Sequence, residues 1–161
     1  MTCAGLIESG ARTAGLVGQL GASDCETLGA GTLVQPVNTI TSLAYVAVGL
    51  GVLVVARRRG RLGVDAWVFA GLLAGIGLGS VAFHGTQPAG ARVMHDLPIL
   101  LTVLYLVARD VELLRDRPGR WQLWVPSAVA ATAITLVDVE VGTALTGLAV
   151  VAVVVLEAVI L

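Results

Sequence analysis

Five long apolar stretches dominate this 161-residue chain and determine what it can fold into. They cover about residues 36–56, 66–83, 97–114, 121–137 and 141–161, and each approaches or exceeds the ~20 residues with which an α-helix crosses a bilayer. Apolar residues make up 57% of the chain and charged residues 13%, against about 25% charged residues in a soluble domain. A water-soluble protein of this length could not bury so much apolar surface. The sequence therefore predicts an all-α fold, a polytopic transmembrane helical bundle.

The chain divides into an N-terminal leader and the bundle. Residues 1–33 are rich in Gly and Ala and only weakly apolar, which indicates an exoplasmic leader with a short interfacial helix around residues 16–20. Residues 34–161 form the transmembrane bundle. Residues 4–20 are too polar for the apolar core of a signal peptide. Cys3 and Cys25 form either a disulfide or two free thiols, and their spacing alone does not decide between these.

Arginines are distributed unequally over the connections and predict the orientation of the chain. Eight of them lie in or beside the first–second and third–fourth connections, namely Arg57, Arg58, Arg59, Arg61, Arg109, Arg115, Arg117 and Arg120. By the positive-inside rule these connections are cytoplasmic and the N-terminus lies outside. The basic residues are all Arg, and Ala, Gly and Val are abundant, which is typical of a GC-rich bacterial gene and points to a bacterial plasma membrane. A net charge of −1 gives no general attraction to nucleic acid.

Four polar residues are expected at one membrane level on the outer side. Asn38 opens the first stretch, Ser80 and His84 close the second, and Asp96 precedes the third. Ser80 and His84 share one helix face, about 6 Å apart along the axis. Ionisable groups are costly in hydrocarbon and usually functional, so the set predicts a metal or proton-transfer site.

Each of these residues also has a simpler interpretation. His84 alone could be a solvated histidine at the membrane interface, and Ser80 could bond a carbonyl of its own helix. Asp96 could be a helix N-cap, with Pro98 in the first turn. A catalytic zinc needs three protein ligands, and the chain offers His84 with only His95 and Asp96 in addition. A Ser80–His84 dyad is a further option, although such dyads usually take their base from a separate element.

Taken in order, these motifs resemble the alkaline ceramidase family. The matching residues are Cys25-Glu26, Asn38-Thr39, the S-x-x-x-H element of Ser80 and His84 within Gly79–Thr86, and Asp96-Leu97-Pro98. The resemblance covers about residues 24–100 and extends to the superfamily of seven-helix membrane hydrolases that includes the adiponectin receptors. It implies a seven-helix bundle of which this chain shows five spans, with the last two helices absent.

The resemblance implies zinc-dependent hydrolysis of a lipid amide, typically ceramide, within the membrane. His84 would be one zinc ligand, Asp96 would orient or deprotonate the zinc-bound water, and Ser80 would hold that water or the developing oxyanion. A zinc ion lowers the pKa of its bound water to about 7 and polarises a carbonyl. The family's other two zinc ligands form an H-x-x-x-H element on the last helix, and this chain has no such element.

The family also carries a calcium site in its N-terminal segment. Asp24 and Glu26 match two of its acidic ligands. Gln35 stands where a further carboxylate is expected, so the acidic set is incomplete for a cation that takes several carboxylate and carbonyl oxygens.

Three expectations concern the rest of the bundle. The missing H-x-x-x-H element leaves an alternative function, a non-enzymatic lipid-binding or receptor-like protein of the same fold. Gly71, Gly75 and Gly79 recur every four residues, which predicts that the second helix approaches a neighbour closely. Glu157, in the fifth stretch, either lines a cavity or lies near the inner interface.

Overall fold

The computed structural model describes Leu20, Gly21, Asp24 and residues 26–161. Cys3, Cys25 and most of the predicted interfacial helix lie outside these residues. The described part folds into helices joined by short connections, which confirms the predicted all-α class. The helices are α2 (Pro36–Arg58), α3 (Val64–His84), α4 (Ala91–Arg115), α5 (Arg120–Val137) and α6 (Val139–Ile160).

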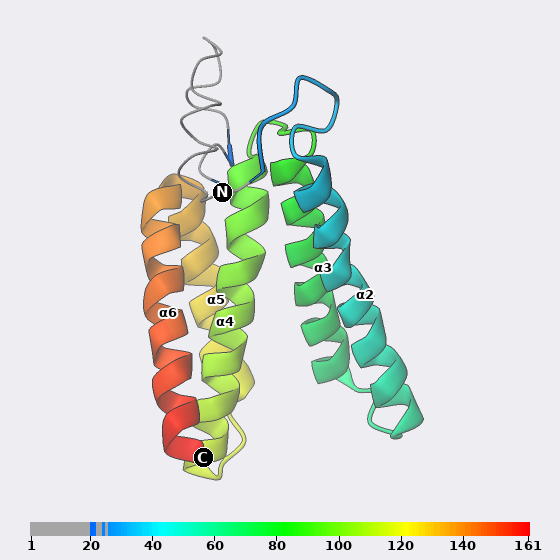
Figure 1. Cartoon of the computed structure of the whole chain (residues 1–161). Helices are drawn as coiled ribbons and strands as arrows, with labels where there is room; N and C mark the ends of the chain where they lie inside the picture. The colour runs from blue at the N-terminus through cyan, green and yellow to red at the C-terminus, as the bar shows by residue number, and fades with distance from the viewer. Residues whose placement is uncertain (1–19, 22–23, 25) are drawn as a thin grey trace.

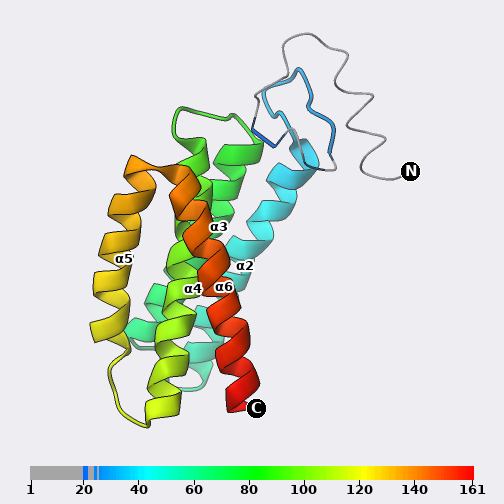
Figure 2. The same cartoon turned by 90° about the vertical axis from the view of Figure 1, so that its left-hand side faces the viewer.

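Consecutive helices run up and down, so that their connections gather at two opposite ends (Figure 1). The α2–α3 hairpin lies beside a group formed by α4, α5 and α6. Helix α4 contacts α3, α5 and α6, whereas α2 contacts α3 alone among the described helices. Seen from the side, α6 lies in front of α4 and next to α5 (Figure 2). Helix α4 therefore joins the two halves of the bundle.

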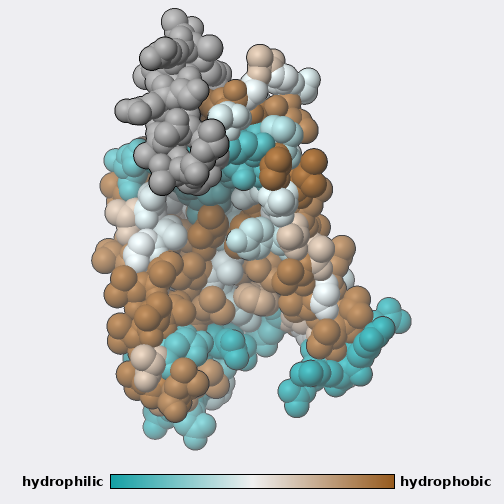
Figure 3. All heavy atoms as spheres, in the orientation of Figure 1, coloured by the Kyte–Doolittle hydropathy of each residue, from teal (hydrophilic) through white to brown (hydrophobic). Residues whose placement is uncertain are grey.

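The surface of the bundle is apolar along its length. Helices α2, α3 and α6 are each long and apolar enough to cross a membrane. Helix α4 does not reach this standard because it carries charged residues near both ends, and α5 is shorter and begins with Arg120. Hydrophobic atoms cover much of the flanks in Figure 3, while hydrophilic atoms gather at the lower ends. This distribution suits a membrane protein.

Helix α4 begins at Ala91, earlier than the predicted start near residue 97. Gly90 precedes it with φ +80°, a left-handed conformation that suits glycine. The N-cap interpretation of Asp96 is therefore wrong, because Asp96 lies in the second turn. Pro98 lies inside the helix, and since proline has no N–H, the carbonyl of Met94 loses its usual helical donor.

The predicted close approach of α3 occurs at the upper end of its glycine stripe. A Cβ atom added at Gly79 would overlap the carbonyl oxygen of Met94 and lie 3.1 Å from the Cα of His95. At Gly75 it would lie 3.3 Å from the ring of Pro98, and at Gly71 it would meet nothing within 4 Å. The backbone of α3 therefore packs on the segment of α4 in which Pro98 leaves the Met94 carbonyl without its helical donor. This contact brings the last turns of α3 against the first turns of α4.

The segment before α2 is tied to the ends of α2 and α3. The carboxylate of Glu26 accepts hydrogen bonds from the backbone N–H groups of Val37 (2.8 Å) and Asn38 (2.7 Å). A negative charge at a helix N-terminus is favourable because free N–H groups and the helix dipole meet there. The backbone N–H of Val34 donates to the carbonyl of Gly85 at 3.0 Å. These bonds hold the N-terminal segment over the end of α3.

Candidate functional site

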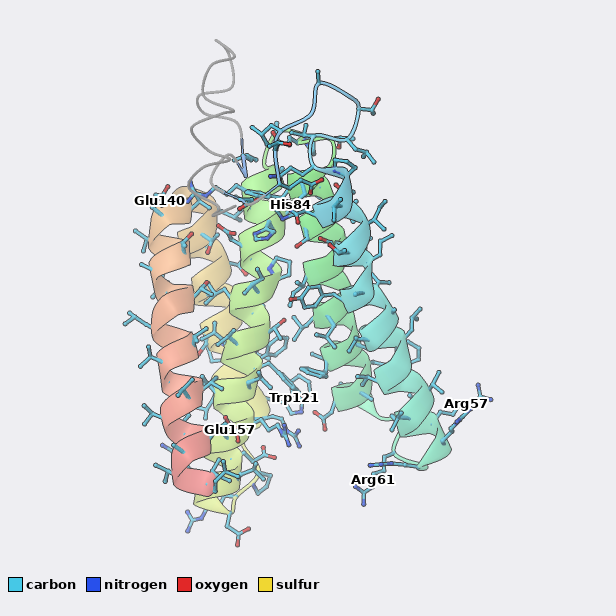
Figure 4. The ribbon with its side chains drawn as sticks, viewed as in Figure 1. Arg57, Arg61, His84, Trp121, Glu140 and Glu157 are labelled. Carbon is cyan, nitrogen blue, oxygen red and sulfur yellow. The ribbon has the colours of Figure 1, made fainter. Side chains whose placement is uncertain are left out.

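The predicted site residues lie at one end of the bundle. His84 is the last residue of α3, Ser80 lies one turn before it, and Asp96 lies in the second turn of α4. Figure 4 shows His84 and Glu140 at the end opposite to Arg57 and Arg61. Glu157 lies in the last turn of α6, with its side chain exposed, at the arginine-rich end. The candidate site and the arginine-rich connections therefore occupy opposite ends.

The imidazole of His84 is held from the N-terminal side. Its Nδ1 atom lies 2.6 Å from Oε1 of Gln35 and 3.4 Å from Oδ2 of Asp24. The His84 side chain is only 14% exposed, and Gln35 is fully buried. With Nδ1 engaged by Gln35, Nε2 is the ring nitrogen that remains available.

A second imidazole lies next to the first. The ring centroids of His84 and His95 are 5.8 Å apart, and the rings are perpendicular. Nδ1 of His95 lies 2.7 Å from Oδ1 of Asp96. The ring of Phe83 packs on His95 with a centroid distance of 4.6 Å, which covers one side of the pair. Helices α3 and α4 thus place two imidazoles side by side, each with Nδ1 bonded to an oxygen.

The carboxylate of Asp96 is fixed through both oxygens. Its Oδ2 atom accepts a hydrogen bond from the hydroxyl of Thr143 on α6 at 3.1 Å and lies 3.7 Å from Nε of Arg92. Arg92 in turn contacts Glu140 at 2.6 Å. Arg92 is therefore paired with two acidic side chains, one on α4 and one on α6.

Ser80 is buried, with 6% exposure, on the α3 segment that packs against α4. Among the described residues it makes no hydrogen bond to His84, whose Nδ1 is taken by Gln35. The Ser80–His84 dyad therefore has no support in the geometry. The roles of Ser80, His84 and Asp96 inferred from the resemblance remain predictions.

The residues present offer part of a zinc site. A catalytic zinc takes three protein ligands and keeps a fourth position open. His84 and His95 have the second-shell pattern of metal-binding histidines, in which one ring nitrogen bonds an oxygen and the other is left for the metal. No group of three or more His, Cys, Asp and Glu side chains that could hold a metal occurs in the described part of the chain. These residues alone do not fit a catalytic zinc.

The residues that match the calcium site are engaged otherwise. Both carboxylate oxygens of Glu26 bond the start of α2, and the carbonyl oxygens of Gly21 and Glu26 accept from the side-chain amide of Gln35. Asp24 keeps one buried oxygen, Oδ2, without a hydrogen-bond partner among the described residues. With Glu26 and these carbonyls engaged, the carboxylate of Asp24 alone supplies too few oxygens for a calcium ion, which takes 6–8 oxygen ligands.

Two contacts of the candidate site do not follow from the sequence pattern. The sequence indicates Gln35 only as the replacement for a carboxylate and does not indicate its bond to His84. Thr143 bonds Asp96 from a helix far along the chain. A long polar side chain between apolar residues, directly before the proline that starts a helix, is a signal that could have indicated Gln35.

Comparison with protein families gives one match. The model of the family described as Ceramidase matches residues 32–161, which include α2 to α6 and the residues of the candidate site except Asp24 and Glu26. No curated protein and no solved structure matches the chain. Because the family match covers most of the sequence, the chain belongs to the ceramidase family.

Proposed function

We propose that this protein hydrolyses the amide bond of a ceramide-like lipid at the exoplasmic side of a bacterial plasma membrane. The observation that carries the proposal is the arrangement of His84, His95 and Asp96 at one end of an apolar bundle. The ceramidase family match supports a lipid hydrolase at the family level. The arginine-rich connections at the opposite end support the orientation, because such connections are usually cytoplasmic.

The chemistry required is the addition of water to an amide carbonyl. The oxygen of water bonds to the carbonyl carbon, the C–N bond breaks, and the proton from water ends on the leaving amine nitrogen. The hydrogen-bonded pair of His95 and Asp96 accepts that proton and returns it, since a carboxylate on Nδ1 stabilises the charged imidazole and fixes its tautomer. Ser80, on the facing helix, is the proposed partner of the developing oxyanion.

The proposal includes zinc, with His84 as one ligand. Zinc would supply an activated water and a polarised carbonyl. The described residues do not complete its ligand set.

The test is hydrolysis of a fluorescent ceramide in lipid nanodiscs by the protein purified as the product of its complete gene. We expect Asp96→Asn to lower kcat by about 100-fold or more, the range for loss of acid–base catalysis. Asp116→Asn is the matched control, because Asp116 is exposed at the opposite end of α4 and its left-handed backbone (φ +47°) tolerates Asn.

Two results would contradict the proposal. Asp96→Asn with the activity of the control would remove the proposed acid–base pair from the mechanism. Saturable ceramide binding without turnover in the wild-type protein, together with the absence of zinc in elemental analysis, would favour the non-enzymatic lipid-binding alternative.

A further inference from the structure

Both ends of the side-chain amide of Gln35 are engaged at this end of the described structure. Gln35 is fully buried. Its Nε2 atom donates to the carbonyls of Gly21 (2.9 Å) and Glu26 (3.2 Å), and its Oε1 lies 2.6 Å from Nδ1 of His84. Its backbone N–H also donates to the carbonyl of His84 at 2.8 Å. Gln35 therefore holds His84 through both backbone and side chain.

These contacts assign the orientation of the amide and the tautomer of the ring. Backbone carbonyls only accept hydrogen bonds, so the NH₂ group of Gln35 must face Gly21 and Glu26. The amide oxygen then faces His84, and because that oxygen only accepts, Nδ1 of His84 must carry a hydrogen. A neutral ring with hydrogen on Nδ1 has its lone pair on Nε2.

We propose that Gln35 is the positioning residue of the site, which fixes the His84 ring in the Nδ1–H tautomer and so directs the Nε2 lone pair to the reaction. The use of this lone pair rests on the proposed function, whereas the tautomer itself does not. The amide anchors the ring to two backbone carbonyls that lie 14 and 9 residues before Gln35. The N-terminal segment is thereby part of the site.

The amide group suits this place better than a carboxylate would. A glutamate here would present a negative oxygen to the carbonyls of Gly21 and Glu26, and the buried Oδ2 of Asp24 already lacks a hydrogen-bond partner among the described residues. Such a cluster of acceptors would need a cation between its members. The two N–H donors of Gln35 satisfy the carbonyls without one. The positioning of His84 is therefore independent of added metal.

The test reads the tautomer of His84 directly. The chain has only two histidines, so protein labelled with ¹⁵N-histidine gives two ring patterns, and His95→Gln assigns them by removing one. The spectra are recorded on metal-stripped protein at alkaline pH. We expect hydrogen on Nδ1 of His84. Hydrogen on Nε2 would overturn the proposal.

Matched substitutions separate positioning from a general structural role. Gln35→Met keeps the length of the side chain but removes both the amide oxygen and the NH₂ group. We therefore expect the His84 ring to become a mixture of tautomers. We expect Gln35→Glu, which keeps an oxygen acceptor, to retain the Nδ1–H form. Gln122→Met is the control on α5, where Gln122 is exposed near the opposite end of the bundle. A His84 tautomer unchanged in Gln35→Met would also overturn the proposal.

Stability and turnover give two supporting measurements. Gln35→Met leaves buried carbonyls without donors, so we expect Tm to fall by roughly 5–10 °C more than in Gln122→Met. Loss of a residue that orients an active-site histidine typically costs about 10–100-fold in activity. Because the tautomer is measured without substrate, its failure is distinct from a failure of the protein to hydrolyse lipid.

Discussion

Replacing Gly79 by alanine adds a methyl group where the backbones of α3 and α4 touch. The new carbon would overlap the Met94 oxygen and lie 2.7 Å from the Met94 carbonyl carbon, whereas ordinary contacts begin at 3.4 Å. The helices must therefore separate by more than half an ångström at this point. Overpacking of this kind typically costs about 1–3 kcal/mol. The higher helix propensity of Ala relative to Gly stabilises the variant by at most about 1 kcal/mol.

The same helix face supplies two matched controls. Gly71→Ala meets nothing within 4 Å and should gain up to about 1 kcal/mol from helix propensity alone. Gly75→Ala, at 3.3 Å from Pro98, should fall between the two. The gain in helix propensity is common to both variants, so we expect Gly79→Ala to be less stable than Gly71→Ala by the overpacking cost, about 1–3 kcal/mol, or roughly 2–12 °C in Tm measured in detergent.

Activity should follow the same order more steeply. The added methyl group also lies 3.1 Å from the Cα of His95, so the separation of the helices moves His95 away from His84. A displacement of about 1 Å in an active site can cost about 100-fold in rate. Equal Tm and equal ceramide turnover in Gly79→Ala and Gly71→Ala would refute the reasoning. The close approach of α3 to α4 at Gly79 would then contribute nothing to stability or activity.

Three further predictions concern single contacts. Glu26→Ala removes the acceptor for the first N–H groups of α2, and we expect the free energy of unfolding to fall by about 1–2 kcal/mol. We also expect the Tm of the wild-type protein to stay the same when calcium is added. A large calcium-dependent rise in Tm would instead indicate a cation site. Thr143→Val removes the hydroxyl that α6 donates to Asp96, and ceramide turnover should fall about tenfold, a result that unchanged kinetics would exclude. Asp110→Leu removes a buried carboxyl whose Oδ2 has no partner in the described structure, so Tm should rise by a few degrees, and a fall would show that this carboxyl has an unseen favourable contact.

The sequence predicts the helices well because each is a long apolar run. It also predicts the up-and-down order, since short connections force neighbouring helices to be antiparallel. The predicted start of α4 is too late because the first turns carry Arg92, His95 and Asp96, and these polar residues interrupt the apolar run. Side chains of α6 bond Arg92 and Asp96, and Phe83 of α3 packs on His95. A single-sequence pattern does not show such contacts.

The site was only partly predictable for a related reason. The spacing of Ser80 and His84 places them on one helix face, and the reversal at the α3–α4 loop brings Asp96 to the same end. The direction of each side chain depends on neighbours that are distant in the chain. Gln35 lies 49 residues from His84, and Thr143 lies 47 residues from Asp96. No local spacing rule connects such pairs.

The order of the site residues along the chain has a consequence for biosynthesis. Gln35 lies directly before α2, His84 ends α3 and His95 lies in α4, and chains are made and folded from the N-terminus onward. Their contacts can thus form while the ribosome is still translating α5 and α6. Thr143 and Glu140 join Asp96 and Arg92 only when α6 has inserted. The contacts among Gln35, His84 and His95 therefore do not require the later helices, whereas Asp96 gains its bond to Thr143 only with the last described helix.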